Sequence, residues 1–436
     1  MENRVSAGGA RLRALFDAGT FVETGAYICR EDGKTPEGVA TGYGAVAGRL
    51  VFAFAQDGEN LCGALDGNYA KKIGALYDKA TSVGAPIVGI FDSAGALVFD
   101  GAAALAGYGV LLRAAAGAKG KVPQIAVIDG AATGTMAAFS ALFDFTVVVR
   151  GKSKLYVSSP SLTNEKIGTA EYAFESGNAA ILCESGAADA EVRRLLAYLP
   201  DAAKNGTPFA ANGDDLNRML PLGAKATAAE ALELSADAGS FLPLYGGVAP
   251  EVKVGLAALG GVSAAVAAID GALTAAGIEK MTCITEKAAL LALPLVTFIN
   301  CTGVAPSEKE EEKLARALAA WARAQVSFGG ARVAAVVGSA IGAGFIFGAS
   351  RTLGNDLVLA LPESEIAALS APAAVAFLWN DRIGGEVTRE KLENEWLETR
   401  ATPVAAAAGG EVDDVVEPRE LRARIISAVY MLLGKK

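Results

Sequence analysis

The chain repeats itself after 208 residues. Residues 85–96 (APIVGIFDSAGA) align with residues 293–304 (LPLVTFINCTGV), and residues 124–135 (QIAVIDGAATGT) align with residues 332–343 (RVAAVVGSAIGA). In both copies an apolar run that suits a buried strand ends in a glycine turn, and the two turn glycines are 39 residues apart, at 95 and 134 and at 303 and 342. The repeat predicts two similar halves, each with two strand-to-glycine turns whose backbone N–H groups lie at matching places.

Length and composition favour two globular domains. A chain of 436 residues suits two domains of roughly 200 residues, each able to bury its own core. The Pro, Asn and Gly positions of residues 201–215 (DAAKNGTPFAANGDD) are typical of a surface connection. A content of 52% hydrophobic and 20% charged residues indicates compact domains rather than a disordered chain. We expect an N-terminal domain at 1–225 and a C-terminal domain at 226–436.

The overall charge argues against nucleic acid as a partner. The net charge is −9, whereas phosphate-backbone binding needs a concentrated basic face. A small anionic ligand is still compatible with the sequence, because it needs only a few local Lys or Arg side chains and helix N-termini.

The absence of histidine restricts the chemistry. It removes the usual general base near neutral pH, the Ser/His and Cys/His nucleophile pairs and the commonest metal ligand. The five cysteines are odd in number and never spaced as CxxC, so we expect neither a disulfide framework nor a metal site. The charged start of the chain does not resemble a signal peptide, and a reducing cytoplasm fits best. Backbone donors, carboxylates or a cofactor must carry the reaction.

One apolar run is nearly long enough to span a membrane. Residues 333–350 (VAAVVGSAIGAGFIFGAS) are flanked by arginine on both sides. Their repeat partner, residues 125–140, is interrupted by Asp129 and is typical of a strand followed by a turn. We therefore favour a buried strand, glycine turn and helix for this run.

Helical and strand patterns alternate along both halves. Apolar residues at three- and four-residue spacing predict helices at 66–83, 101–117, 284–292 and 307–325, and short apolar strands follow or precede them. Alternation of this kind is typical of an α/β fold with a largely parallel sheet.

Paired glycine turns can stabilise negative charge without an ionisable side chain. A strand that ends in glycine and runs into a helix leaves N–H groups unpaired, and two such turns side by side form a cradle for a developing oxyanion. The candidate donors are Gly95 and Ala96 with Gly134 and Thr135 in the first half, and Gly303 and Val304 with Gly342, Ala343 and Gly344 in the second. Close packing of helix against strand is the alternative explanation of each single glycine.

The chain resembles, over nearly its whole length, the carboxyltransferase subunits of biotin-dependent acyl-CoA carboxylases and decarboxylases. The matching stretches, which are specific in their order and spacing, include ARLRALFDAGTFVE, GALDGNYAKKI, PIVGIFDSAGA followed by LAGYG, VPQIAVIDGAATGTMAAFSALFDF, LPLVTFINCTGV, GSAIGAGFIFGAS and LGNDLVLALPESEIA. The resemblance implies two tandem crotonase-like domains, each a β/α spiral. It also implies a thioester held by the first domain, biotin facing the second, and an active site completed by another subunit.

Carried over to this sequence, the resemblance assigns a role to each pair of turns. Gly95, Ala96, Gly134 and Thr135 would hold the thioester oxygen as an enolate forms, and the turns at Gly303 and Gly342 would hold the ureido oxygen of biotin. Lys71, Lys72 and Arg150 are candidate contacts for CoA, although a lysine on a helix face is often simply solvated. In the family, proton transfer is ascribed to biotin and substrate, which agrees with a chain that lacks histidine.

The sequence contains no biotin-attachment motif of the AMKM type, so biotin would arrive on a biotin carrier protein. Further partners implied by the resemblance are a biotin carboxylase or a membrane decarboxylase subunit, in a homo- or hetero-oligomer. The chain would be the transferase component alone.

Several motifs depart from the family pattern. The usual SGGAR is SAGAL, which puts Leu97 where a basic residue is common, and the usual CAGG turn is ATGT, which puts Thr135 at the second glycine. An alternative is therefore a catalytically degenerate subunit that assembles with an intact homologue. A crotonase-type thioester hydrolase or hydratase is a third candidate, for which Asp100 and Glu175 are the acids we can name.

Overall fold

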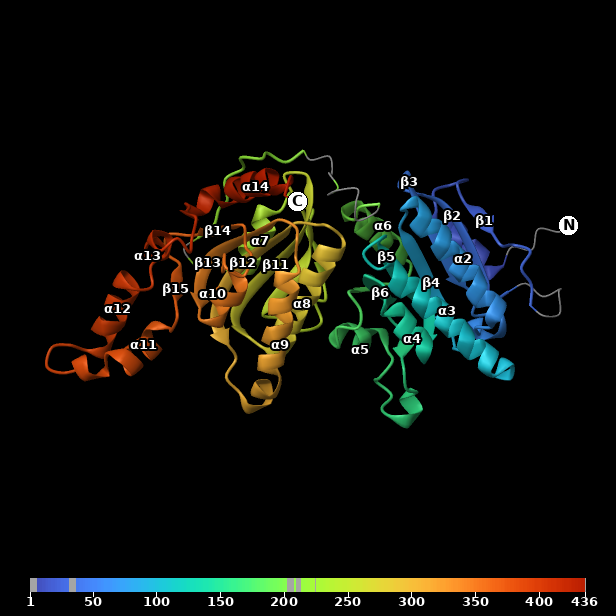
Figure 1. Ribbon diagram of the computed structural model, residues 1–436, viewed down its shortest axis with the longest axis horizontal. Helices are drawn as coiled ribbons and strands as arrows, with labels where there is room; N and C mark the ends of the chain where they lie inside the picture. Colours follow the sequence, from blue (N-terminus) through green and yellow to red (C-terminus); the bar gives the residue numbers. More distant parts are fainter. Residues whose placement is uncertain (1–5, 31–36, 202–207, 209–212, 224, 436) are drawn as a thin grey trace. The chain divides into compact units, whose positions relative to one another are not determined.

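The computed structural model describes the chain except for residues 1–5, 31–36, 202–207, 209–212, 224 and 436. The chain forms two compact units. The first unit consists of Met1–Gly206 together with Tyr245–Val248, and the second of Thr207–Leu244 together with Ala249–Lys436. Figure 1 shows the first unit in blue to green and the second in yellow-green to red.

The first unit contains a mixed sheet in the order β1-β2-β3-β4-β5-β6-β8, and β7 pairs with β5. The strands are β1 Val22–Thr24, β2 Val39–Val46, β3 Arg49–Gln56, β4 Ile87–Ser93, β5 Gln124–Thr133, β6 Phe145–Val149, β7 Lys154–Tyr156 and β8 Ile181–Cys183. Pairs β1·β2 and β2·β3 are antiparallel, whereas β3·β4, β4·β5, β5·β6 and β6·β8 are parallel. The predicted largely parallel sheet is confirmed for this unit.

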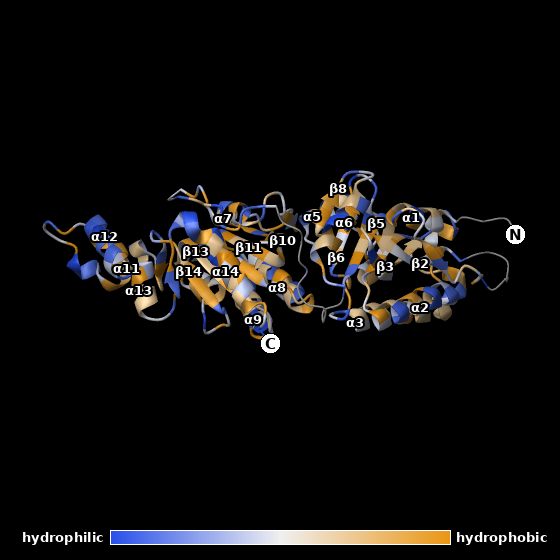
Figure 2. Cartoon of the chain, turned by 90° about the horizontal axis from the view of Figure 1, so that it is seen from above, coloured by the Kyte–Doolittle hydropathy of each residue, from blue (hydrophilic) through white to orange (hydrophobic). Residues whose placement is uncertain are grey.

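Helices connect the parallel strands, as the alternating pattern predicts. These connecting helices are α2 Gly67–Val83, α3 Ala102–Ala118, α4 Thr135–Ser140 and α5 Ala170–Glu175, while α1 Ala7–Leu15 precedes β1 and α6 Ala188–Tyr198 follows β8. Asp66 caps α2 by accepting the Tyr69 N–H. Gly84 ends the helix with a φ of 73°, a left-handed conformation that favours glycine. Apolar residues of α2 face the sheet, and hydrophilic residues (blue in Figure 2) cover its outer side.

The second unit repeats this arrangement in a sheet of order β16-β14-β13-β12-β11-β10-β9, with β15 paired to β13. The strands are β9 Leu242–Leu244, β10 Val252–Leu259, β11 Val262–Leu273, β12 Leu295–Val304, β13 Arg332–Ile341, β14 Leu357–Ala360, β15 Glu365–Ala367 and β16 Asp414–Val415. The helices are α7 Ala228–Ser235, α8 Ala275–Leu290, α9 Glu308–Val326, α10 Ala343–Gly348, α11 Ala371–Leu378, α12 Arg389–Thr399, α13 Pro403–Ala408 and α14 Leu421–Leu432.

Two sequence predictions for the second unit can be checked directly. The run 333–350 is strand β13, then Gly342, then helix α10, as predicted. Within the described ranges no helix is long and apolar enough to cross a membrane. The helix predicted at 284–292 was placed wrongly at its start, because α8 already begins at Ala275, where the Thr274 hydroxyl caps it by accepting the Gly277 N–H.

The 208-residue repeat is visible in the strand registers. Ile87 of β4 lies opposite Gln124 of β5, and Leu295 of β12 lies opposite Arg332 of β13. Both registers shift at the same place, between Phe91 and Ser93 in the first unit and between Ile299 and Cys301 in the second. The sequence repeat is therefore a repeat of backbone geometry, including the irregularity that comes just before the first glycine turn.

In the first unit, an aspartate after α1 holds the hairpin turn between β2 and β3. The carboxylate of Asp17 accepts the N–H groups of Ala47 (3.2 Å) and Gly48 (2.9 Å). Arg193 of α6 donates to the same carboxylate (2.8 Å) and to the Leu15 carbonyl at the end of α1 (2.9 Å). These bonds fix the end of α1 against the hairpin.

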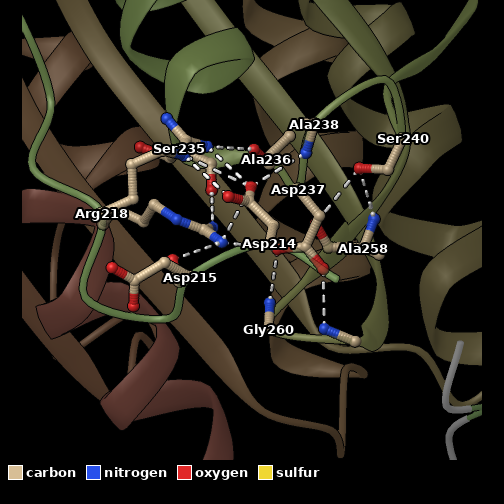
Figure 3. A network of polar contacts seen from close by, with 12 residues as sticks. Asp214, Asp215, Arg218, Ser235, Ala236, Asp237, Ala238, Ser240, Ala258 and Gly260 are labelled. Atoms are coloured by element: carbon tan, nitrogen blue, oxygen red, sulfur yellow. Dashed lines mark hydrogen bonds and ion pairs between the residues drawn. The ribbon is translucent and has the colours of Figure 1, made fainter. Parts of the chain in front are cut away.

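The second unit has the same clamp, drawn in Figure 3. The carboxylate of Asp237 accepts the N–H groups of Gly260 (2.8 Å) and Gly261 (2.7 Å) in the turn between β10 and β11. Arg422 of α14 donates to Asp237 (2.9 Å) and to the Ser235 carbonyl at the end of α7 (2.7 Å). The aspartate is the first residue of DAGTF in the first unit and of DAGSF in the second. In both units it accepts the N–H groups of the hairpin turn.

Candidate active site

The first turn of the first unit follows β4. Gly95 has a φ of 120°, and its carbonyl accepts the Leu65 N–H (2.9 Å). The Leu65 carbonyl in turn accepts the Leu97 N–H (2.8 Å), so Ala96 lies in a short parallel bridge with Leu65. Bonds on either side of Ala96 direct its own N–H away from Leu65. Within the described part of the chain, that N–H has no acceptor.

The second turn follows β5. Gly134 has a φ of 59° and a ψ of −130°, a backbone conformation that side-chain-bearing residues avoid. Its N–H donates to the Tyr156 carbonyl of β7 (2.9 Å). Helix α4 begins at Thr135, whose N–H lies at the first helical position and has no acceptor among the described residues.

The two turns are neighbours. A Cβ placed on Gly95 would lie 3.8 Å from Thr133 Oγ1 and 3.9 Å from the Thr133 carbonyl oxygen. Thr133 Oγ1 also donates to the Ala94 carbonyl (2.8 Å), which ties the end of β5 to the first turn. Beneath the turns, Phe91 of β4 packs against Phe139 of α4 with ring centroids 5.5 Å apart. Burial of these rings fixes β4 and α4 relative to each other.

The structure therefore distinguishes the two members of each predicted donor pair. The Gly95 N–H already donates to Ser93 Oγ (3.2 Å), and the Gly134 N–H is used by β7. The glycines supply the turn geometry, whereas Ala96 and Thr135 supply the unpaired amides.

The second unit shows the same pattern. Gly303 has a φ of 114°, and Val304 lies opposite Leu273 in the parallel register, at the repeat positions of Ala96 and Leu65. Gly342 has a φ of 52°, and its N–H donates to the Ala367 carbonyl of β15 (2.9 Å).

Helix α10 provides the unpaired amides of the second unit. It begins at Ala343, and in the described ranges the N–H groups of Ala343 and Gly344 have no acceptor. A Cβ on Gly303 would lie 3.8 Å from the Ile341 carbonyl oxygen, so these two turns are neighbours as well.

The three candidate CoA contacts lie in different environments. Lys71 is exposed, with Nζ 3.4 Å from Asn68 Oδ1. Arg150 is also exposed and pairs with Glu184 (2.8 Å) and Glu171 (3.3 Å). Lys72 is only 5% exposed, and its Nζ donates to the Val39 carbonyl (2.6 Å). Burial lowers the pKa of Lys72. The structure thus places two of the three cations where an anionic ligand can reach them.

A cavity of about 280 Å³ adjoins the second turn of the first unit. It is lined by Lys152, Lys154, Tyr156, Gly168 and Thr169, among others. Tyr156 links the cavity to the turn, since its carbonyl accepts the Gly134 N–H. The lining carries both signs of charge, since Glu165 and Glu171 lie there as well and Lys152 pairs with Asp129 (2.8 Å).

Tyr108 of α3 was not among the candidates from the sequence. Its hydroxyl lies 3.7 Å from the position that a Cβ on Gly95 would occupy. The only signal for it in the sequence is its place in LAGYG, downstream of the first turn. Helical periodicity alone assigns this tyrosine to the core.

Comparisons with known proteins identify the family of the chain. The family described as carboxyl transferase domain matches residues 9–436. The chain is 31% identical to the carboxyltransferase subunit of propionyl-CoA carboxylase from Haloferax mediterranei and 32% identical to the alpha subunit of methylmalonyl-CoA decarboxylase from Propionigenium modestum. Each match covers 98% of this chain and 90% of the relative.

A solved structure is similar over the same extent. The crystal structure of transcarboxylase 12S, a hexamer with methylmalonyl-coenzyme A and methylmalonic acid bound, matches with a TM-score of 0.91 at 26% identity and covers 98% of this chain and 90% of that one. The chain belongs to the carboxyl transferase domain family. The predicted family and the predicted fold of two tandem crotonase-like domains are confirmed.

Proposed function

We propose that this chain is the carboxyltransferase component that moves a carboxyl group between carboxybiotin on a partner protein and an acyl-CoA, in a carboxylase or decarboxylase complex. The observation that carries the proposal is the pair of neighbouring turns with unpaired amides at Ala96 and Thr135. Family membership supports it. Relatives are named for propionyl-CoA and methylmalonyl-CoA, so we propose a short acyl group.

In the first unit, the Ala96 and Thr135 N–H groups would donate to the thioester oxygen. When the α-carbon gains or loses a carboxyl group, an enolate develops and negative charge moves onto that oxygen. Fixed amides stabilise this charge more than the neutral carbonyl, so they lower the barrier rather than only tightening binding. Removal of one such donor typically raises the barrier by about 3 kcal/mol.

In the second unit, the Ala343 and Gly344 N–H groups fit the ureido oxygen of biotin, because they are unpaired and converge on one turn. Bound biotin supplies a ureido nitrogen that carries the carboxyl group. The amides would hold the ureido group in place and stabilise negative charge on its oxygen.

Cations of the first unit would hold the CoA phosphates. We keep Lys71 and Arg150 as candidates, because both are exposed. Lys72, which donates to the Val39 carbonyl, would instead support the packing of α2. The cavity beside Tyr156, whose lining includes Lys152 and Lys154 as well as Glu165 and Glu171, lies next to the turn that would hold the thioester.

The partners follow from this chemistry. We propose a biotin carrier protein, further subunits of a carboxylase or a membrane decarboxylase, and an oligomer in which another copy or a homologue completes the site. A hexamer is the assembly of transcarboxylase 12S. We place the enzyme in the cytoplasm, since none of the five cysteines is in a disulfide, which suits a reducing compartment.

The test uses the purified full chain, free biotin and methylmalonyl-CoA, with malonyl-CoA in parallel. Release of CO₂ and formation of the decarboxylated thioester, measured by chromatography, are expected to require both biotin and protein. A protein that neither decarboxylates these substrates nor binds CoA thioesters in calorimetry would refute the proposal.

A catalytically degenerate assembly subunit is the second candidate. Leu97 and Thr135, which replace a basic residue and a glycine of the family pattern, favour it. It predicts that a second, more regular transferase chain co-purifies and that substitutions at Gly134 and Gly342 leave the activity of the complex unchanged.

A further inference from the structure

Helix α3 packs unusually closely against the segment that precedes α2. A Cβ on Gly107 would lie 3.2 Å from the Asp66 carbonyl oxygen and 3.2 Å from Ala70 Cβ. Both distances are tighter than ordinary van der Waals contact, so the absence of a side chain at Gly107 permits this approach. The neighbouring Leu65 is paired with Ala96. The close contact therefore fixes α3 with respect to the first turn.

Tyr108 follows Gly107 on the helix. The residue is 6% exposed, and its hydroxyl lies 3.7 Å from the Cβ position of Gly95. Among the described residues, the hydroxyl has no hydrogen-bond partner. A tyrosine hydroxyl that has no partner in its own chain can donate to a ligand that binds beside the first turn.

Burial raises the pKa of Tyr108 to about 12. The hydroxyl therefore keeps its proton throughout the range in which the enzyme would work, and it can donate but not act as a base. Tyr69 on α2 is fully buried, and burial also raises its pKa. Neither tyrosine introduces negative charge near the turn.

We propose that the Tyr108 hydroxyl is a third hydrogen-bond donor to the thioester oxygen, beside the N–H groups of Ala96 and Thr135. This inference rests on the proposed function of the first turn. The hydroxyl gives a hydrogen bond to the oxygen as the enolate forms, and no proton is transferred. It is a catalytic residue, since it touches the reacting group, and Gly107 is a positioning residue that lets the helix deliver it.

The test combines kinetics with infrared spectroscopy of propionyl-CoA labelled with ¹³C at the carbonyl carbon. Hydrogen bonds lower the carbonyl stretching frequency of the bound thioester. Tyr108→Phe is expected to lose part of the lowering seen in the wild-type chain. Its kcat for decarboxylation of methylmalonyl-CoA with free biotin should fall on the order of 10²-fold, with KM within about threefold of wild type.

Two matched controls separate this role from packing. Tyr77→Phe removes a buried hydroxyl that bonds Gln124 Oε1 (3.0 Å) on the same unit, and it should leave the carbonyl frequency and kcat unchanged. Gly107→Ala should reduce the lowering of the carbonyl frequency and should lower kcat, although Tyr108 is still present. Gly109→Ala, where a Cβ would meet nothing within 4 Å, should not.

The outcomes are distinct. A Tyr108→Phe variant with the wild-type carbonyl frequency and a kcat within about twofold of wild type would overturn the role of Tyr108 while leaving the proposed function intact. A wild-type chain that neither shifts the carbonyl band of propionyl-CoA nor decarboxylates methylmalonyl-CoA would overturn both.

Discussion

The two units use the same carboxylate clamp in different surroundings. In the first, Arg193 and Asp17 hold the hairpin turn with side chains that are 35% and 31% exposed. In the second, Arg422 and Asp237 make the equivalent bonds with side chains that are 0% and 5% exposed. Arg422 also pairs with Asp214, which brings in the segment before α7. Hydrogen-bond geometry is thus duplicated, whereas burial is not.

The difference shows that two copies of one motif can contribute different amounts to the free energy of unfolding. Solvent screens an exposed ion pair, which contributes about 0–1 kcal/mol. Removing one partner of a buried pair leaves a charge without compensation and costs about 3–5 kcal/mol. The same reasoning applies to the glycine turns, because we propose that the shared backbone geometry binds a different oxygen in each unit.

The largest expected effect separates the two clamps. Arg422→Ala should lower the free energy of unfolding by about 3–5 kcal/mol, because Asp237 and Asp214 lose a buried partner. Denaturant unfolding followed by tryptophan fluorescence reports on the second unit, since Trp321, Trp379 and Trp396 all lie there.

Arg193→Ala, followed by far-ultraviolet circular dichroism, should lower the free energy of unfolding by less than about 1 kcal/mol. Arg424→Ala on α14, which removes an exposed pair with Glu420 just before that helix, serves as the control for the second unit. Equal losses for Arg193 and Arg422 would mean that burial does not set the energy of this clamp.

The next effect concerns the turn amides. Thr135→Pro and Ala343→Pro each remove one N–H at the first position of a helix, where proline is tolerated. Each should lower kcat for decarboxylation by about 10²- to 10³-fold. Only Thr135→Pro should also weaken the infrared shift of the carbonyl of bound propionyl-CoA.

Thr135→Ala retains the N–H and is the control, with activity expected within about threefold of wild type. A Thr135→Ala loss as large as that of Thr135→Pro would assign the effect to the side chain instead of the amide.

A smaller effect distinguishes the acidic and amide residues at equivalent positions. Asp92 Oδ1 accepts the Ala131 N–H, and Asn300 Oδ1 accepts the Ser339 N–H, both at 3.0 Å. Asn300 also donates to Asp270 (3.1 Å). Asn300→Asp should therefore destabilise the second unit by about 1–3 kcal/mol, since it loses this donor and sets two carboxylates against each other.

Asp92→Asn keeps its acceptor oxygen and should change the free energy of unfolding by less than about 1 kcal/mol. Denaturation curves of both variants at pH 7 provide the measurement. A larger loss of unfolding free energy for Asp92→Asn than for Asn300→Asp would contradict the role assigned to the Asn300–Asp270 hydrogen bond.

The last prediction concerns the pH dependence of stability. Lys280, the repeat partner of Lys72, donates to the Val252 carbonyl (2.6 Å), and burial lowers its pKa from 10.5 to about 8. Between about pH 8 and 10.5 the unfolded chain holds a proton that the folded chain has lost, so the free energy of unfolding rises with pH. Below pH 8 the buried charge destabilises the fold fully.

Lys280→Met should remove this part of the rise, whereas Lys309→Met, on the exposed side of α9, should not. Unfolding curves between pH 7 and 10.5 test the difference. Identical slopes for the wild-type chain and Lys280→Met would show that burial does not shift the titration of this lysine.

Much of the backbone was predictable from the sequence, because the repeat and its glycines are local signals. The turn at Gly342 followed from the apolar run around it, and α9 followed from its helical spacing; the structure adds that Ser307 caps this helix. Hydrogen-bond partners were not predictable. Tyr156, which uses the Gly134 N–H, lies on a separate short strand, and no spacing in the sequence reveals that pairing.

Side-chain burial was also beyond the sequence. Lys71 and Lys72 are adjacent in the chain, yet only Lys72 turns into the core, because helix rotation separates neighbouring residues by about 100°. Tyr108 owes its place beside Gly95 to the close contact at Gly107, which depends on the tertiary packing of α3 against Asp66.

A crystal structure of the protein with a CoA thioester bound tests the central claim most directly. The account predicts that the thioester oxygen lies about 3 Å from the amide nitrogens of both Ala96 and Thr135. A thioester whose oxygen is bound elsewhere, with both amides turned to acceptors of their own chain, would contradict it.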